Sequence, residues 1–503
     1  MPGSAIGIDM GTSAVKGILL VDDAVAAHSR RSYPLELGPG GRVEVDPERV
    51  ARAAEAVIAR LARVGRRRGQ PIGAIGASGS GDEAVWVDAA GRAVAPVPRA
   101  LDSRATDAAT RLESAIGGDR LYATTGLPLA GIHPLVRLMW LRDTDPVAAR
   151  RVRRLLAWPE FLALRLGLAP VGEPSLAARS LAFDVHQRRY DPSILAAAGV
   201  SGDVFAPLFA TGAVVGDIPV SCAEPLGLET PVVVVAGGFD QAMAMFGTGI
   251  VEPGIGHLGL GSWAAVMALV GEAPEDAPMR TSGLSIGPSV AGAAHFAVMG
   301  SSAGGIVPAW LGTLAGRGPA TGPRRIAQLA ARAPDRPTGL LGLSHFEGSY
   351  TPWLDPASRG GIAGLGLGTD ASILARGLLE AVAYELLEIL GRLGAAGVAV
   401  DRIHASGGGS RSRTWVQLIT DVVGLPIARA RESDAGALAA ACFAATALGS
   451  FSSAEEAVRA VVRFDLEVDP RPEVSAAYAE TAARHAGLYP ALRDWRAAGA
   501  GPR

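Results

Sequence analysis

The stretch Ile6-Gly7-Ile8-Asp9-Met10-Gly11-Thr12-Ser13-Ala14-Val15-Lys16 decides the fold of this chain. Its alternating apolar residues predict a strand, a tight glycine turn and a second strand that starts near Val15. Backbone N–H groups and the two hydroxyls of the turn can face phosphate oxygens, and Asp9 can hold a hydrated metal ion. A plain turn with Asp9 as an Asx residue is the alternative. Lys16 is the only lysine among the 503 residues.

Composition limits the class of protein. With 503 residues, 49% of them hydrophobic, the chain is long enough for two or more domains with their own cores. A formal net charge of −2 does not indicate binding to nucleic acid or to an anionic membrane surface. No apolar run reaches the ~18 residues of a membrane span, and no signal peptide is expected. Two cysteines are too few for a disulfide framework or a metal cluster. We therefore expect a soluble, multi-domain α/β protein of a reducing compartment, the cytoplasm.

The opening pattern recurs in the second half of the chain. The segment His257–Met267 again reads as a strand, a glycine–hydroxyl turn at Gly261-Ser262, and a strand. Two such hairpins, each opening a mixed α/β segment, predict a duplicated architecture with a nucleotide between the halves. Their pairing favours phosphate binding over plain turns. We expect one domain over residues 1–248, a second over 249–450 and a helical C-terminal extension over 451–503.

Two glycine-rich segments follow predicted buried strands. Gly407-Gly408-Gly409-Ser410 stands between a strand and a helix, where its backbone can approach a flat ligand closely; a flexible loop is the alternative. Gly237-Gly238-Phe239-Asp240-Gln241 ends a run of four valines, and ligands of open α/β sheets bind at the carboxyl ends of strands. A carboxylate there can accept a hydroxyl proton during phosphoryl transfer. Asp240 can also be the N-cap of a helix that starts near Ala242, and both interpretations stay open.

Other nucleotide and metal motifs are absent or out of context. Gly254–Gly259 satisfies G-x-G-x-x-G, but it leads into an alternating strand rather than a helix, so no dinucleotide site is expected. The sequence has no G-x-x-x-x-G-K-[ST] phosphate loop. Its eight histidines include no H-x-x-x-H pair, so a metal cage is not expected.

Taken together, these residues resemble the FGGY family of carbohydrate kinases from about Ile6 to about Leu448. That family includes xylulokinase, gluconokinase, erythritol kinase and glycerol kinase, and the subgroup stays open. The landmarks occur in family order: Asp9-x-Gly11-Thr12, Gly41–Pro47, Gly76–Asp88, Asp102-Ser103-Arg104, Gly237–Gln241, Leu260–Ser262, Asp355–Gly360 and Gly407–Ser412.

The resemblance implies a fold, a reaction and a set of site residues. The fold would be the actin-like (ribonuclease H-like) ATPase fold, with two duplicated domains and ATP in the cleft between them. The reaction would be Mg²⁺-dependent transfer of the ATP γ-phosphate to a hydroxyl of a sugar or polyol of the xylulose, gluconate or erythritol class. Asp240 would be the general base, and Asp9 would position Mg²⁺ through water. Substrate contacts are expected from Asp82, Asp102 and Gln241. Nucleotide contacts are expected from Gly11, Thr12, Ser13, Lys16, Gly261, Ser262, Gly304, Gly408 and Gly409.

The segment expected to contact substrate departs from the family pattern. Where xylulokinases usually carry Met-His-Gly, this chain has Gly81-Asp82-Glu83, and Ser80-Gly81-Asp82 is closer to the erythritol kinase-like subgroup. In the second hairpin, Ser262-Trp263 replaces Thr-Ser, which removes one hydroxyl and adds an indole. The sequence therefore does not name the sugar.

Two other functions stay open beside the kinase. A nucleotide-responsive regulatory protein or pseudo-kinase on the same fold is one, although the retained Asp240 argues against it. An actin- or chaperone-type ATPase is the other, and the order of the landmarks argues against it. The expected partner is a small-molecule sugar or polyol, without nucleic acid or membrane. A homodimer is one option for the assembly.

Overall fold

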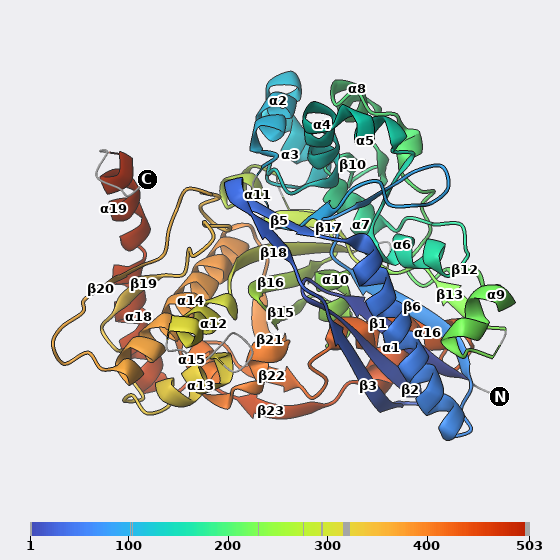
Figure 1. Cartoon of the computed structure of the whole chain (residues 1–503). Coiled ribbons are helices and arrows are strands. Elements are labelled where there is room, and N and C mark those ends of the chain that lie inside the picture. Colours follow the sequence, from blue (N-terminus) through green and yellow to red (C-terminus); the bar gives the residue numbers. More distant parts are fainter. Residues whose placement is uncertain are drawn as a thin grey trace. The chain divides into compact units, whose positions relative to one another are not determined.

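The structure is a computed structural model of the chain, and it describes residues 3–100, 102, 104–229, 231–274, 276–292, 295–314 and 322–497. The chain divides into two compact units, each built around a mixed β-sheet (Figure 1). Unit 1 comprises Met1–Val251, Ile286–Ala297 and Asp434–Val462; unit 2 comprises Glu252–Ser285, Val298–Ser433 and Arg463–Arg503. Within the described residues, no helix is both long and apolar enough to cross a membrane.

The sheet of unit 1 contains the predicted N-terminal hairpin. β1 (Ser4–Met10) pairs antiparallel with β2 (Ala14–Val21) and parallel with β6 (Ile72–Gly79). The order of strands is β12-β13-β6-β1-β2-β3, and β14 pairs with the end of β6. The other members of this sheet are β3 (Ala24–Ser32), β12 (Val214–Asp217), β13 (Val233–Val235) and β14 (Gly238–Phe239).

Helices and short strands complete unit 1. α1 (Pro47–Arg67) begins after Asp46, which accepts a hydrogen bond from the Glu48 N–H, and Pro47 occupies the first helical position. The other helices are α2 (Thr106–Ile116), α3 (Gly118–Thr125), α4 (Pro134–Thr144), α5 (Pro146–Arg151), α6 (Trp158–Arg165), α7 (Pro174–Ala177), α8 (Pro192–Ala197), α9 (Val220–Ala223), α10 (Asp240–Phe246), α16 (Ala435–Ala447) and α17 (Ala454–Val461). The short strands are β4 (Glu36–Gly38), β5 (Arg42–Val45), β7 (Val85–Val87), β8 (Val97–Pro98), β9 (Arg154–Leu156), β10 (Phe183–Asp184) and β11 (Arg189–Tyr190).

The alanine-rich helix α16 packs directly on the backbone of the unit 1 sheet, against β1 and β6. A Cβ atom at Gly7 would lie 1.9 Å from the Ala437 carbonyl oxygen, and one at Gly76 would lie 2.3 Å from that of Ala440. Neither strand position can therefore carry a side chain without moving the helix. The small residues of α16 are explained by this close packing.

Unit 2 repeats the arrangement of hairpin and parallel strand. β15 (Gly254–Leu260) pairs antiparallel with β16 (Trp263–Val270) and parallel with β21 (Val400–Ser406). Strands β18-β16-β15-β21-β22-β23 follow one another in the sheet. Its other strands are β18 (Phe296–Ala303), β22 (Ile427–Ala430) and β23 (Phe464–Val468), and a separate pair is β19 (Leu341–Leu343) and β20 (Gly361–Ala363). The short strand β17 (Ser285–Pro288) begins at the last residue of a unit 2 segment and continues into unit 1. The helices are α11 (Asp276–Thr281), α12 (Ile306–Leu314), α13 (Gly322–Ala330), α14 (Ala371–Ala395), α15 (Arg413–Val423), α18 (Pro472–His485) and α19 (Leu488–Trp495).

The compact units differ from the linear domains expected from the sequence. The chain first passes from unit 1 to unit 2 after Val251, close to the boundary expected after residue 248. Residues Asp434–Val462 then return to unit 1, because α16 covers the sheet that β1 opens. The segment 451–503 is also not only helical, since β23 pairs antiparallel with β22 and buries Leu466 and Val468. The residues of this segment beyond 497 lie outside the described part.

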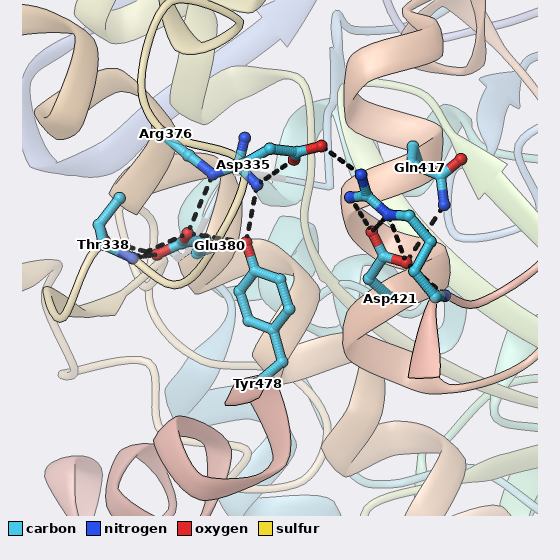
Figure 2. Close-up of polar contacts among 8 residues, drawn as sticks. Asp335, Thr338, Arg376, Glu380, Gln417, Asp421 and Tyr478 are labelled. Atoms are coloured by element: carbon cyan, nitrogen blue, oxygen red, sulfur yellow. Dashed lines mark hydrogen bonds and ion pairs between the residues drawn. The ribbon is translucent and has the colours of Figure 1, made fainter. Parts of the chain in front are cut away.

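A buried polar network connects α14 to α18 within unit 2 (Figure 2). The Arg376 guanidinium donates to Asp335 Oδ1 at 2.8 Å and to the Tyr478 hydroxyl at 3.0 Å. The Tyr478 hydroxyl in turn donates to Glu380 Oε1 at 3.0 Å, and Glu380 also accepts from the backbone N–H and hydroxyl of Thr338. Burial raises the pKa of Glu380, while its hydrogen bonds with Thr338 and Tyr478 oppose that change.

A second part of the network joins α15 to the start of α18. Arg471 donates to Asp421 Oδ2 at 2.5 Å and also pairs with Asp335, and Gln417 donates to Asp421 at 3.2 Å. Asp421 is fully buried, so these donors satisfy a carboxylate that water does not reach. Helix α18 is therefore attached to the rest of unit 2 by polar contacts as well as by packing.

We expect Tyr478→Phe to lower the free energy of unfolding by about 1–3 kcal/mol, because Glu380 and Arg376 each lose a buried hydrogen bond. Urea denaturation followed by tryptophan fluorescence measures the change. Tyr190→Phe is the matched control, because the Tyr190 hydroxyl forms no hydrogen bond within the described residues and its loss should stay within ~0.5 kcal/mol. Equal effects of the two substitutions would contradict the network's role.

Candidate active site

Three polar groups converge at the N-terminus of α16 in unit 1. Asp9 is the last residue but one of β1, and its Oδ1 accepts a hydrogen bond from the Ser78 hydroxyl at 3.0 Å. Gly436 lies against both: a Cβ atom there would be 3.1 Å from Ser78 Oγ, 3.6 Å from Asp9 Oδ1 and 3.6 Å from the Asp240 carbonyl oxygen. Residues far apart in sequence are thus brought to one point at the ends of β1, β6 and β14. Gly436 is buried, and it lets α16 pack closely against this point, where a side chain would crowd the Ser78 hydroxyl.

Lys16 lies between two carboxylates. Its Nζ is 3.1 Å from Asp434 Oδ1 and 3.6 Å from Asp9 Oδ2. Although burial alone lowers the pKa of Lys16, the charges of Asp9 and Asp434 outweigh it and raise that pKa, so the ammonium stays charged. Lys16 is therefore paired within unit 1, and its contact with phosphate stays a prediction. The pairing with Asp434 joins residues 418 positions apart (434 − 16).

Side chains from outside the first hairpin fix the backbone of its turn. The Gly11 carbonyl oxygen accepts hydrogen bonds from the Tyr33 hydroxyl and, at 3.4 Å, from the Arg99 guanidinium. The hydroxyls of Thr12 and Ser13 make no hydrogen bond within the described residues, and neither residue is buried. Both hydroxyls are therefore available to a ligand.

Asp240 is the first residue of α10 rather than the cap before it. The N-cap position is Phe239, and α10 begins two residues earlier than the sequence suggests, so the N-cap interpretation of Asp240 is wrong. The Phe239 N–H donates to the Ser175 hydroxyl at 3.0 Å, and that hydroxyl in turn contacts the buried Glu173 at 2.5 Å. This chain of buried contacts fixes the backbone that carries Asp240.

The pKa of Asp240 is raised to about 7. Burial is the main cause, followed by the negative charges of Asp9 and Asp82; the Gln241 N–H donates to the carboxylate and acts in the opposite direction. A carboxylate with such a pKa can take up a proton close to neutral pH.

Asp82 and Glu83 follow β6, and each is paired with a guanidinium. Asp82 Oδ1 accepts from Arg179 Nε at 2.9 Å and from Nη2 at 2.7 Å. Glu83 Oε2 lies 2.6 Å from Arg99 Nη1, and both side chains are buried to within 1% of full burial. Arg137 donates to the backbone carbonyl of Asp82 at 2.9 Å. The segment after β6 is thereby held rigidly beside Asp240.

The two other residues expected to contact substrate differ in availability. Asp102 is buried, and its oxygens accept from the Val43 N–H at 3.0 Å and from Arg104 Nε at 2.9 Å. Its acceptor sites are thus occupied by protein donors, which fits a role in orienting Arg104. Gln241 is half-buried, and its side chain forms no hydrogen bond within the described residues. Ser103, the middle residue of the quoted D-x-R element, lies outside them.

In unit 2 the second hairpin turn lies against the start of α12. The Gly261 carbonyl oxygen accepts from the Gly305 N–H at 2.9 Å, and the Ser262 carbonyl accepts from the Gly304 N–H at 3.2 Å. A Cβ atom at Gly304 would lie 2.6 Å from the Ala264 nitrogen. Gly304 is therefore required for the close approach to the hairpin, independent of any ligand.

The three glycines after β21 have different surroundings. Gly407 has φ +90°, and a Cβ atom there would lie 2.7 Å from the Leu260 carbonyl oxygen. A Cβ atom at Gly409 would lie 2.8 Å from the Trp415 ring. Gly408 is exposed, and a Cβ atom there would meet nothing within 4 Å. Packing explains two of these glycines, whereas Gly408 is the one whose backbone is open to a ligand.

Comparison with known proteins shows to which class of protein this fold belongs. Residues 4–247 match the N-terminal domain of the FGGY family of carbohydrate kinases, and residues 257–448 match its C-terminal domain. Glycerol kinase from Aromatoleum aromaticum is 28% identical over 464 residues, which cover 90% of this chain and 91% of that protein. Xylulose kinase from Bacillus subtilis is 26% identical, with 91% of each chain covered. The crystal structure of xylulose kinase from Rhodospirillum rubrum has a TM-score of 0.84, 25% identity, and coverage of 98% of this chain and 99% of that one.

The chain belongs to the FGGY family of carbohydrate kinases. This confirms the resemblance seen in the sequence, the actin-like fold and the class of enzyme, an ATP-dependent kinase of sugars or polyols.

Proposed function

We propose that Asp240 is the general base of this kinase and that it takes the proton of a sugar or polyol hydroxyl as that hydroxyl attacks the γ-phosphate of ATP. The observation that carries the proposal is the convergence of Asp240 with Asp9 and Ser78, together with the pKa of about 7 for Asp240. A base with this pKa is largely ionised at slightly alkaline pH and still basic enough to accept a hydroxyl proton. In phosphoryl transfer the protein mainly positions the reactants and neutralises the charge of the phosphates.

The other site residues of unit 1 are proposed to bind and orient the substrate and the nucleotide. Asp82 and Gln241 are proposed to accept and donate hydrogen bonds to substrate hydroxyls. Thr12, Ser13 and Lys16 are proposed to contact phosphate oxygens, because their hydroxyls are available and the ammonium is charged. Lys16 would then exchange part of its contact with Asp434 for the nucleotide.

Mg²⁺ fits the donor set at the end of β1. The Asp9 carboxylate supplies hard oxygen ligands, and Mg²⁺ is usually held by one or two carboxylates with several waters. When bound, Mg²⁺ neutralises phosphate charge. In unit 2 we propose nucleotide contacts from Gly261, Ser262, Gly408 and Gly409, and a supporting position for Gly304 behind the hairpin. Both cysteines are free thiols, which supports a cytoplasmic location.

We expect Gly408→Leu to raise the KM for ATP at least about fivefold with little change in stability, because its side chain would occupy the open space at the exposed backbone. Gly407→Ala is the contrasting variant. It should lower the free energy of unfolding by about 1–3 kcal/mol, because φ is +90° and Leu260 lies in the way. ATP titrations and urea denaturation distinguish the two. An unchanged KM for ATP in Gly408→Leu would remove Gly408 from the nucleotide site.

The proposed function is tested by coupled measurement of ADP release with a panel of tetritols, pentitols, ketopentoses, gluconate and glycerol. At least one compound should raise the rate of ADP release tenfold or more over ATP alone. If none does, and ATP only stabilises the protein against heat, a regulatory nucleotide-binding role replaces the kinase.

A further inference from the structure

Glu385 is a carboxylate in the interior of unit 2, on α14 beside the end of β18. It is 4% exposed, and its Oε2 accepts a hydrogen bond from the hydroxyl of Ser302, which is also buried. Its Oε1 accepts from the Ser344 N–H at 2.8 Å. No arginine or lysine in the part of the chain that the structure describes forms an ion pair with it. Packing alone does not explain such a residue, because burying a carboxylate without a permanent cation is costly.

His345 holds the same carboxylate in place from another side. Its Nε2 lies 3.3 Å from Glu385 Oε1, and its Nδ1 lies 2.7 Å from the hydroxyl oxygen of Ser358. Burial lowers the pKa of His345, and the charge of Glu385 opposes this change only in part, so the ring is uncharged at physiological pH. An uncharged imidazole has one N–H and one acceptor nitrogen, so Nε2 donates toward Glu385 and Nδ1 accepts from Ser358. The Ser358 N–H donates to Asp355 Oδ1 at 3.1 Å, which fixes this end of the network.

Ser302, at the other end, comes two residues before the backbone that contacts the second hairpin. The Gly304 and Gly305 N–H groups donate to the carbonyls of Ser262 at 3.2 Å and Gly261 at 2.9 Å. A Cβ atom at Gly305 would lie 2.8 Å from the Gly261 carbonyl oxygen, so the two backbones are in direct contact. A displacement of the end of β18 therefore moves the hairpin turn as well.

We propose that Glu385 is a positioning residue of the nucleotide site. Through the hydroxyl of Ser302 it fixes the end of β18, and through that strand it holds the turn Gly261-Ser262 in the orientation that receives phosphate. This role rests on the proposed function, because it concerns the nucleotide contacts of the same kinase. It also accounts for a carboxylate, rather than an apolar side chain, at this buried position of α14.

Ser302→Ala and Glu385→Met each break the contact between α14 and β18 at one end. In both variants the Kd for MgADP and the KM for ATP should rise at least about fivefold, as expected for the loss of one buried hydrogen bond. The kcat at saturating ATP and the KM for the phosphorylated sugar should stay within about twofold, since the substitutions lie outside unit 1. The double variant should bind MgADP within about twofold of the weaker single variant, because both substitutions remove the same contact. Isothermal titration calorimetry and steady-state kinetics give these values.

Glu385→Gln is the conservative variant. Its amide oxygen can still accept from the Ser344 N–H, and its NH₂ group can donate to the Ser302 hydroxyl oxygen. The contact between α14 and β18 is thereby kept, so the Kd for MgADP should stay within about twofold of wild type. A role that depended only on packing would not distinguish Gln from Met at this position.

Two matched controls separate positioning from a general loss of stability. Glu380→Met removes another buried carboxylate of α14, whose partners are Thr338 and Tyr478. Ser285→Ala removes a buried hydroxyl that donates to the Met299 carbonyl of β18 at 3.4 Å. Both controls should leave the Kd for MgADP within about twofold of wild type, even where they lower the free energy of unfolding.

The outcomes separate this role from the kinase activity. If Ser302→Ala binds MgADP as tightly as wild type, or if Glu380→Met weakens binding equally, the inference is overturned while the kinase stands. If MgADP binds and the variants behave as expected but no compound of the panel raises ADP release, the kinase proposal fails while the positioning role is supported. If neither ATP nor MgADP binds the wild-type protein, both fail. Should Glu385→Met not fold, Ser302→Ala decides, because it removes a single hydroxyl.

Discussion

Asp240→Asn is expected to lower kcat by about 10²–10⁴-fold, the usual contribution of a positioned general base. The asparagine keeps the size of the side chain but cannot accept the proton of the substrate hydroxyl. In the wild-type enzyme, kcat/KM should fall tenfold per pH unit below about 7, where Asp240 becomes protonated in the free enzyme. The variant should lack this limb. Steady-state rates between pH 5.5 and 9 measure both effects, with Asp107→Asn on the exposed start of α2 as a control.

The same substitution should stabilise the folded protein at high pH. The pKa of Asp240 in the folded state, about 7, exceeds its ordinary value of 3.8 because burial and neighbouring carboxylates disfavour the charge. Folding therefore favours the protonated form, and the stability associated with it is full below pH 3.8 and is lost as the pH rises through about 7. At pH 8, Asp240→Asn should melt a few °C higher than wild type, and the difference should vanish near pH 4. A variant that is both active and no more stable at pH 8 would contradict the assignment of Asp240.

Arg99→Met should lower the free energy of unfolding by about 3–5 kcal/mol, because it leaves Glu83 buried without its cation. Glu83 would retain hydrogen bonds from the Ala100 N–H and the Trp158 indole, which do not neutralise its charge. The turn at Gly11 would also lose one of its two donors. We therefore expect weaker ATP binding in the same variant. Urea denaturation gives the stability, and ATP titration gives the affinity.

A double-mutant cycle isolates the pair. Glu83→Gln together with Arg99→Met removes both charges, so part of the stability should return, with a coupling energy of at least ~1 kcal/mol. Arg92→Met is the comparison, because Arg92 pairs with Asp88 at the surface and its loss should cost less than ~1 kcal/mol. A loss below 1 kcal/mol for Arg99→Met would show that the buried pair contributes little.

Local sequence patterns predicted the main strands of the fold. The two hairpins, β1 with β2 and β15 with β16, were predicted from their own residues, and the structure confirms both. The strand β23 was missed because only Leu466 and Val468 are buried in a short segment between two helices. Its pairing with β22 is a tertiary contact that single-sequence periodicity does not report.

The site could be predicted from the sequence less completely than the fold. Asp9, Asp82 and Asp240 stand in motifs, so their residue types and spacing indicate them. Asp434 has no such signal, since only folding brings it to Lys16. The same holds for the hydroxyl of Ser175, which accepts from the backbone N–H before Asp240. Such roles depend on which distant segments lie close together in the folded protein. A single sequence considered alone does not contain that information.

We expect Asp240 to let a substrate hydroxyl, rather than water, receive the phosphoryl group. ³¹P nuclear magnetic resonance of a reaction with ATP and the best polyol or ketose of the panel tests it most directly. We expect a new phosphomonoester signal that grows in step with ADP and is absent with Asp240→Asn. Formation of ADP and inorganic phosphate alone, at a rate independent of the polyol and of Asp240, would contradict it.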